Sequence, residues 1–194
     1  MARLILLNKP FQVLSQFTDP QGRGTLGAYI SDKDFYAAGR LDYDSEGLLL
    51  LCEDGALQQR ITSPLQKTWK RYWLQLEGEI SEEAVDALRQ GVELRDGPTR
   101  PAQASIIQPP PLWPRDPPIR QRARQATSWI EIAIHEGRNR QLRRMTASVG
   151  FPVLRLIRVA IGDWELGGLA PGESRILTVH LPRGPSGRPR RRRT

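Results

Sequence analysis

The chain has 194 residues, which is enough for one sizeable domain or for two small lobes that share a sheet. Its single cysteine excludes an internal disulfide, and its longest apolar runs are too short to span a membrane. Two isolated histidines without a cysteine cluster argue against a zinc site. We therefore expect a soluble cytoplasmic protein that needs no metal ion.

The positive charge is unevenly distributed along the chain. The formal net charge is +8, but residues 182–194 hold six arginines and no acid, so the rest of the chain carries only +2. This composition is typical of a disordered tail. We predict one folded domain over residues 1–181, followed by an Arg-rich disordered tail over residues 182–194.

The first half of the chain reads as short strands interspersed with one short helix and two further helices. Apolar runs bounded by turn residues predict extended segments at 4–7, 11–17, 35–38 and 47–51, with a short helix at 25–30. Asp54 is a typical N-cap for a helix that runs to about Ile61. Alternation predicts a strand over 69–77, and Ser81 opens a second helix that ends at Gly91.

The second half adds more strands and one helix. Short strands are predicted over 92–107, a clearly alternating strand over 129–135, a helix over 138–149, and strands over 153–159 and 175–181. Residues 108–125 are rich in Pro and Arg, which excludes a regular element there. Strands and helices mix without a βαβ rhythm, so the predicted fold class is α+β.

The first candidate for chemistry is Gly39-Arg40-Leu41-Asp42, which precedes the apolar run 47–51. It places one carboxylate, with an arginine two residues before it, on a polar loop between two apolar strands. A loop on a rigid scaffold is a suitable position for an active group. The alternative is an ordinary turn aspartate.

The second candidate is the segment 136–145, where four arginines crowd the predicted start of a helix: Arg138, Arg140, Arg143 and Arg144. Cations are disfavoured at a helix N-terminus, so phosphate is a natural partner for them. The interleaved amides of Asn139 and Gln141 suit RNA. The alternative is a solvated basic face.

The third candidate is Trp69-Lys70-Arg71-Tyr72, in which aromatic rings flank cations on a strand. This pattern suits base stacking beside phosphate contacts. The alternative is that Tyr72, which shares one face of the alternating strand with Leu74 and Leu76, packs with them in the core.

Three other features are set aside. Glycines at 22, 24 and 27 fit a dinucleotide-binding pattern, but no βαβ unit surrounds them. Cys52 follows four leucines and is expected to be a buried strand residue. His135 is expected at a hairpin tip.

At the three motifs the sequence resembles the pseudouridine synthases of the ribosomal small-subunit synthase A type. That family carries G-R-L-D with a following G-L-L-L, a K-x-Y strand, and an E-G-R-x-x-Q-(V/L)-(R/K)-R-M segment. All three occur here in order, and the match continues through Gly150-Phe151-Pro152 and 154–158. Many members begin with an S4-type RNA-binding domain, whereas this chain starts at the catalytic strand, so we expect no such domain.

The resemblance implies two α+β lobes that share a bent mixed or antiparallel sheet, with helices outside and a central RNA-binding cleft. It implies isomerisation of a flipped uridine to pseudouridine without any cofactor. Asp42 would act on the ribose while the glycosidic bond breaks, either by attack at C1′ or by removing a ribose proton. Tyr72 would stack on the base and assist proton removal at C5, and Arg143 would pair with the aspartate.

Arg40 would handle the flipped nucleotide. The other residues expected to contact RNA are Lys70, Arg71, Arg138, Asn139, Arg140, Gln141 and Arg144.

The members that the chain resembles most act on the large ribosomal subunit. We therefore expect a uridine of 23S rRNA, in the peptidyl transferase region, as free RNA or within an assembly intermediate. We expect a monomer without an obligate protein partner. The rival interpretations are a non-catalytic RNA-binding or assembly factor, against which the intact set Asp42, Tyr72 and Arg143 argues, and a dinucleotide enzyme that uses the glycine loop.

Overall fold

A computed structural model describes residues 1–119 and 126–180, and within them one large mixed sheet dominates the fold. Its strand order is β13-β1-β5-β11-β6-β10-β9, with β4 added beside β5 and β12 beside β11. The bounds are β1 Ala2–Lys9, β4 Tyr36–Ala37, β5 Glu46–Cys52, β6 Lys70–Glu77, β9 Gln103–Ile107, β10 Thr127–Ile134, β11 Val153–Ile161, β12 Trp164–Glu165 and β13 Ser174–Val179.

Smaller elements surround this sheet. Two short ribbons pair β2 Val13–Leu14 with β3 Gly24–Thr25, and β7 Glu93–Leu94 with β8 Gly97–Pro98. The helices within the described residues are α1 Gly55–Thr62, α2 Glu82–Gln90 and α3 Gln141–Ser148, with 3-10 turns η1 Leu26–Ala28 and η2 Pro64–Gln66. The mixture of strands and helices confirms the predicted α+β class.

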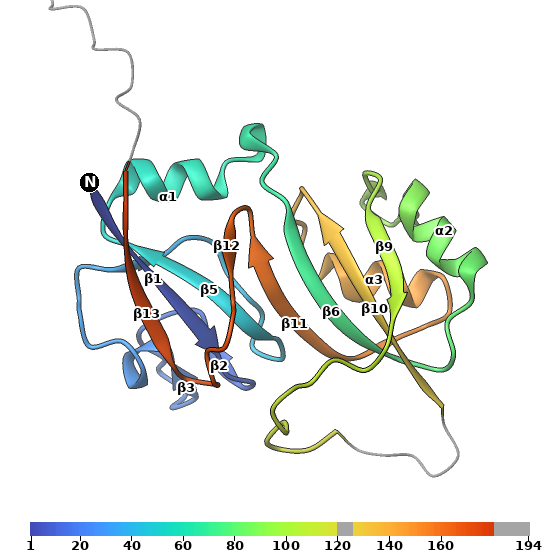
Figure 1. The fold of residues 1–194 in the computed structure, drawn as a ribbon, viewed down its shortest axis with the longest axis horizontal. Coiled ribbons are helices and arrows are strands. Elements are labelled where there is room, and N and C mark those ends of the chain that lie inside the picture. Colours follow the sequence, from blue (N-terminus) through green and yellow to red (C-terminus); the bar gives the residue numbers. More distant parts are fainter. Residues whose placement is uncertain (120–125, 181–194) are drawn as a thin grey trace, which may run out of the picture.

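The sheet divides into two lobes that meet at a narrow joint. One lobe holds β13, β1 and β5, the other holds β6, β10 and β9, and β11 runs between them (Figure 1). The parallel pairing of β5 with β11 spans only Ile157 beside Glu46 and Arg158 beside Gly47. Gly47 has a φ of 102°, and a Cβ there would collide with the Arg158 backbone, so glycine permits this close approach.

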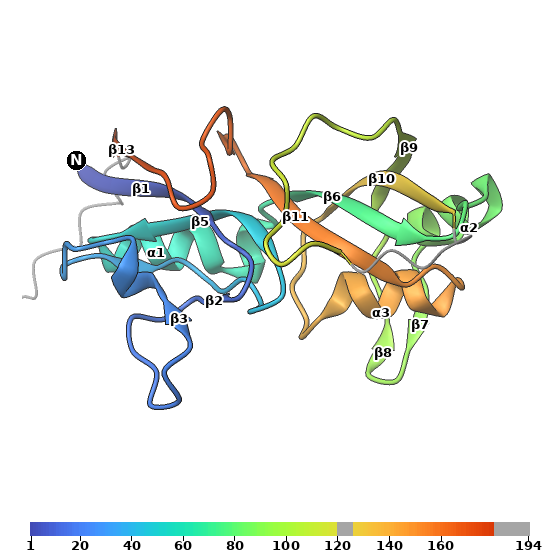
Figure 2. The same cartoon turned by 90° about the horizontal axis from the view of Figure 1, so that it is seen from below.

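The core forms two hydrophobic clusters, because successive side chains of a strand point to opposite faces. One cluster includes Tyr72, Leu74 and Leu76 of β6, together with buried residues of α2 and α3. The other includes Leu48 and Leu50 of β5 with Leu57 and Ile61 of α1. Helix α3 lies on one side of the sheet, and the segment that follows β9 leaves on the other side (Figure 2).

Several predicted elements are confirmed. Helix α1 begins after Asp54, whose Oδ1 accepts a hydrogen bond of 2.8 Å from the backbone N–H of Leu57. Helix α2 begins after Ser81 and ends before Gly91. Residues 108–119 contain no helix or strand, as predicted, while residues 120–125 and the Arg-rich tail lie outside the described residues.

Three predicted elements were wrong in extent. The strand over 11–17 shortens to β2, because Gln12 has a left-handed φ of 56°. The helix over 25–30 is a three-residue 3-10 turn. Helix α3 begins at Gln141 instead of Arg138, because Arg140 takes a left-handed conformation with a φ of 48°. Two of the four arginines therefore precede the helix.

Across the described part of the chain, none of the helices has both the length and the apolar character needed to cross a membrane.

Candidate active site

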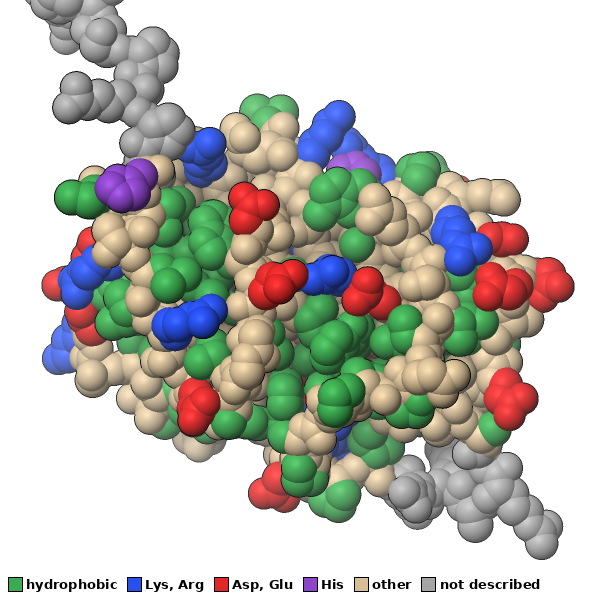
Figure 3. Space-filling model, in the orientation of Figure 1, with side chains coloured by type: hydrophobic (Ala, Val, Ile, Leu, Met, Phe, Trp, Pro, Cys, Tyr) green, Lys and Arg blue, Asp and Glu red, His purple; other side chains and the backbone are tan. Residues whose placement is uncertain are grey.

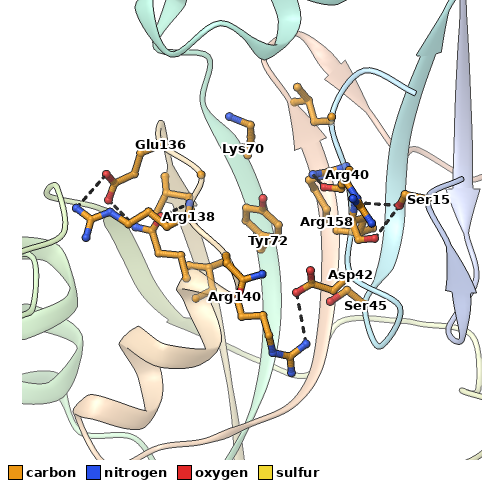
Figure 4. A pocket seen from close by; sticks show the side chains of 18 of the residues that line it. Ser15, Arg40, Asp42, Ser45, Lys70, Tyr72, Glu136, Arg138, Arg140 and Arg158 are labelled. Atoms are coloured by element: carbon orange, nitrogen blue, oxygen red, sulfur yellow. Dashed lines mark hydrogen bonds and ion pairs between the residues drawn. The ribbon is translucent and has the colours of Figure 1, made fainter. Parts of the chain in front are cut away.

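An open pocket of about 910 Å³ lies between the two lobes. Its walls come from the turn before β5, from β6 and β11, and from the segment that connects β10 to α3 (Figure 4). Asp42, Tyr72 and Arg143, which are distant in sequence, all line this pocket. The fold therefore brings the three expected catalytic residues to one place.

Asp42 lies in the turn between β4 and β5. The turn is held by the Ser45 backbone N–H, which donates to the Asp42 carbonyl at 3.1 Å, and by Ser15. The Ser15 hydroxyl donates to the Leu41 carbonyl at 2.7 Å and accepts from the Leu41 N–H at 3.0 Å. The Asp42 side chain is 39% exposed, so a fixed backbone presents a carboxylate that a ligand can reach.

Tyr72 and Lys70 enter the pocket from β6, whereas Arg71 does not. Tyr72 is 7% exposed, is the register partner of Arg158 on the neighbouring strand β11, and faces the side of the pocket where Asp42 lies (Figure 4). Burial and the charge of Arg158 lower the pKa of Lys70. Strand alternation turns Arg71 to the opposite face, where its Nη2 pairs with Glu165 at 2.6 Å. Of these two expected RNA contacts, Lys70 therefore lines the pocket and Arg71 does not.

Asp44 is the carboxylate that Arg140 and Arg143 contact most closely. Arg140 donates to both Asp44 carboxylate oxygens, at 2.9 and 2.8 Å, and lies 3.6 Å from Asp42. Arg143 donates to the Asp44 carbonyl at 2.7 Å and lies 3.4 Å from its carboxylate. The structure thus pairs Arg143 with Asp44, not with Asp42 as expected. Burial opposes ionisation of Asp44, but these arginines outweigh it and lower its pKa.

Some of the other residues expected to contact RNA line the pocket, and one lies outside its lining, at the rim. Arg40 and Asn139 line the pocket, and so does Arg138, whose guanidinium donates to the Gly97 carbonyl at 2.8 Å. Arg144 lies outside the pocket lining and forms a two-point pair with Asp96, at 2.7 and 3.1 Å.

Gln141 also lines the pocket but is only 3% exposed. Its amide donates to the Glu136 carboxylate and accepts from the backbone N–H of Arg138 at 3.1 Å. These contacts brace the segment before α3.

The comparisons with known proteins agree with this geometry. Residues 3–148 match the model of the RNA pseudouridylate synthase family. The chain belongs to this family. It is an enzyme that isomerises uridine to pseudouridine in RNA, and the resemblance given by its three motifs is confirmed.

Named relatives support the same conclusion. The synthase is 59% identical over 172 residues to "Ribosomal large subunit pseudouridine synthase E" of Xanthomonas axonopodis pv. citri (strain 306), covering 87% of this chain and 90% of the relative. A protein with the same description from Vibrio parahaemolyticus serotype O3:K6 (strain RIMD 2210633) is 54% identical, covering 88% and 72%. A solved pseudouridylate synthase has a TM-score of 0.76 at 32% identity, covering 92% of this chain and 71% of that one, which confirms the expected fold.

Arg158 and Lys9 are buried cations of the synthase that were missed from the sequence. Arg158 is 4% exposed and lines the pocket, where its Nε donates to the Leu48 carbonyl at 2.8 Å and its Nη1 to that of Arg40 at 3.4 Å. Lys9 is fully buried, and its Nζ donates to the carbonyls of Pro10 and Val13 at 2.8 and 2.7 Å. The sequence offered one signal for both residues, because each lies in or directly after an apolar run. A charged residue is rarely buried at such a position unless its charge has partners.

Burial lowers the pKa of Lys9 to about 7, against an opposing effect of Glu46.

Within the described residues, no group of three or more His, Cys, Asp or Glu side chains could hold a metal ion.

Proposed function

We propose that this synthase isomerises a uridine of 23S rRNA, in the peptidyl transferase region, with Asp42 as the carboxylate that acts on the ribose. The relatives described as large-subunit synthases support the choice of RNA. The observation that carries the role of Asp42 is its exposed carboxylate in an open pocket, opposite Tyr72 and beside Arg140.

The reaction is a rearrangement in which atoms and electrons balance within the nucleotide. The bond from C1′ to N1 breaks, a bond from C1′ to C5 forms, C5 loses a proton and N1 gains one. Because nothing is oxidised or reduced overall, we propose that the enzyme uses no cofactor. Asp42 acts either by attack at C1′ or by taking a ribose proton, and both routes need it ionised at an accessible position.

Entry of the uridine requires base flipping. Asp42 lies inside a pocket between two lobes, and a base stacked in a helix cannot reach it. Flipping costs a few kcal/mol, which phosphate contacts can offset. We propose that Arg40, Arg138, Asn139 and Arg140 supply contacts at the pocket, and that Arg144 contributes from the rim. Tyr72 stacks on the flipped base.

We further propose that residues 1–181 form one catalytic domain and that the protein acts as a cytoplasmic monomer without an obligate protein partner. Its substrate is rRNA, either free or in an assembly intermediate.

The first prediction concerns Asp42→Asn. This change removes the charge but keeps the shape, so product formation should fall by about a thousandfold or more, as for other essential catalytic groups. RNA affinity should stay within about threefold, because phosphate contacts dominate it. The measurement is tritium release from 23S rRNA labelled at C5 of uridine, with a filter-binding assay in parallel.

The matched control is Asp163→Asn, which removes an exposed carboxylate in the turn between β11 and β12. It should retain normal turnover. Turnover by Asp42→Asn at a rate near that of the control would refute the assignment. Mapping pseudouridines in rRNA from a deletion strain, with and without the restored gene, tests the proposed RNA region.

A further inference from the structure

The narrow joint between β5 and β11 is held on the pocket side by Arg158. The ladder between these strands has only two register pairs, and one of them is Arg158 with Gly47. From β11, Arg158 reaches the carbonyl of Leu48 in β5 and that of Arg40 in the turn that carries Asp42. Because Asp42 precedes β5 by four residues, any shift at this joint moves the carboxylate relative to Tyr72 in the other lobe.

A second set of contacts closes the same joint from the opposite face of the sheet. Glu46 of β5 and Arg155 of β11 form a two-point pair, with both N–O distances at 2.8 Å. Their side chains are 2% and 8% exposed. The indole N–H of Trp113 donates to the Glu46 carboxylate at 2.8 Å, and Arg155 donates to the Trp113 carbonyl at 3.1 Å. We call these three residues the Trp113 clamp.

Trp113 comes from the irregular segment 108–119, which leaves the lobe that contains Tyr72. Its neighbour Arg115 donates to the Leu154 carbonyl of β11 at 3.3 Å, and its guanidinium lies 4.2 Å from the Phe11 ring of the other lobe. Figure 3 shows the face turned away from α3, where hydrophobic side chains gather over the middle of the sheet. The segment therefore bridges both lobes behind the pocket, and the clamp residues are absent from the pocket lining.

We propose that the Trp113 clamp is a positioning device for the reaction, which sets the place of Asp42 relative to Tyr72 by fixing the joint between the lobes. This rests on the proposed role of Asp42. A buried ion pair adds little net stability compared with apolar packing, but its directional contacts select one geometry. The two-point pair and the indole donor fix both the spacing and the register of β5 and β11.

The test is Trp113→Phe, which keeps an aromatic ring but removes the indole donor to Glu46. The expected result is a single-turnover rate constant about tenfold lower, because small misplacement of a catalytic group is costly, with RNA affinity within about twofold. Amide hydrogen exchange of residues 40–46 should become faster. If Trp113→Phe does not fold, Arg155→Lys, which keeps the charge but cannot make the two-point pair, carries the same expectation.

The matched control is Trp73→Phe. Trp73 lies on the same face of the sheet, and its indole N–H donates to the Glu131 carboxylate at 2.9 Å, but β6 and β10 belong to one lobe. This variant should keep the normal rate constant and the normal exchange of residues 40–46. An equal loss of rate in both variants would mean general destabilisation and would overturn the proposal.

Two further results would also overturn it. Unchanged turnover by Trp113→Phe would remove the positioning role, and weaker RNA binding with an unchanged rate constant would make segment 108–119 an RNA contact instead. Asp42→Asn is measured alongside. If that variant turns over normally, the proposed function fails; if it is inactive while Trp113→Phe is normal, only the clamp fails.

Discussion

Asp44 holds one arginine that precedes α3 and one arginine within α3. Arg140 and Arg143 both contact it, so one carboxylate, two residues away from Asp42, holds two guanidinium groups and offsets one of their two charges. Among the described residues, this arrangement leaves the Asp42 carboxylate with one longer ion pair, to Arg140 at 3.6 Å. We infer that Asp44 holds the arginines until an RNA phosphate competes for them, since Arg forks bind carboxylate and phosphate in the same two-point manner.

Asp44→Asn should therefore release Arg140 for phosphate and for Asp42. RNA affinity at low salt should rise, and the slope of log K against log salt should steepen by about one. Turnover should fall, because both arginines then compete for the catalytic carboxylate. Filter binding across a salt series and single-turnover tritium release measure the two effects. Asp44→Glu, which keeps the charge, is the control, and weaker binding by Asp44→Asn would contradict this role.

At the scale of elements, strand alternation was the most reliable sequence signal. It assigned Tyr72, Leu74 and Leu76 to one face of β6, and all three are buried there. Capping residues located α1 and α2 because Asp54 and Ser81 act on backbone groups within their own first turns. Local signals succeed where the partner of a residue is close in the chain.

The same signals fail where the partner is distant. The Glu46 partner of Arg155 is 109 residues away, so two buried arginines in β11 gave no hint of the joint that they hold. The start of α3 was misplaced because Arg140 takes a left-handed conformation, and its side chain pairs with Asp44, which lies 96 residues earlier. For the site, the motif resemblance gathered Asp42, Tyr72 and Arg143 in one pocket, and strand alternation places Arg71 on the opposite face of the sheet.

The buried Lys9 side chain holds the turn between β1 and β2 through its bonds to the Pro10 and Val13 carbonyls. Its lowered pKa makes the free energy of unfolding depend on pH. In the unfolded chain Lys9 binds a proton up to its ordinary pKa of 10.5, whereas in the fold its pKa is about 7. Between these values the unfolded state binds more protons, so the stability contributed by Lys9 rises with pH and is lowest at and below neutral pH.

Lys9→Met should therefore lose this dependence. The difference in unfolding free energy between wild type and variant should grow from pH 7 to pH 9, by at most about 1.4 kcal/mol per pH unit. Urea unfolding at pH 7, 8 and 9 measures the difference, and groups that titrate equally in both proteins cancel. A difference that stays constant would mean that the pKa of Lys9 is not lowered in the fold.

At the scale of the whole molecule, the distribution of charge assigns catalysis to the folded domain and long-range attraction of RNA to the Arg-rich tail. Within the described residues, Asp44 neutralises Arg140, while Asp96 pairs with Arg144 and Arg138. The chain without its last thirteen residues carries a net charge of only +2, whereas residues 182–194 hold six arginines without a carboxylate. Long-range attraction of a polyanion should therefore depend mainly on this tail.

Removing residues 182–194 should weaken RNA binding and make the slope of log K against log salt shallower, by up to about five if all six arginines contact phosphate. The single-turnover rate constant at saturating enzyme should not change, because the groups that line the pocket remain. A full-length variant with the six arginines replaced by glutamine should behave like the truncation, which separates charge from chain length. An unchanged salt slope in both variants would place the phosphate contacts on the folded domain, and the exposed faces of Arg40 and Arg138 would then have to supply them.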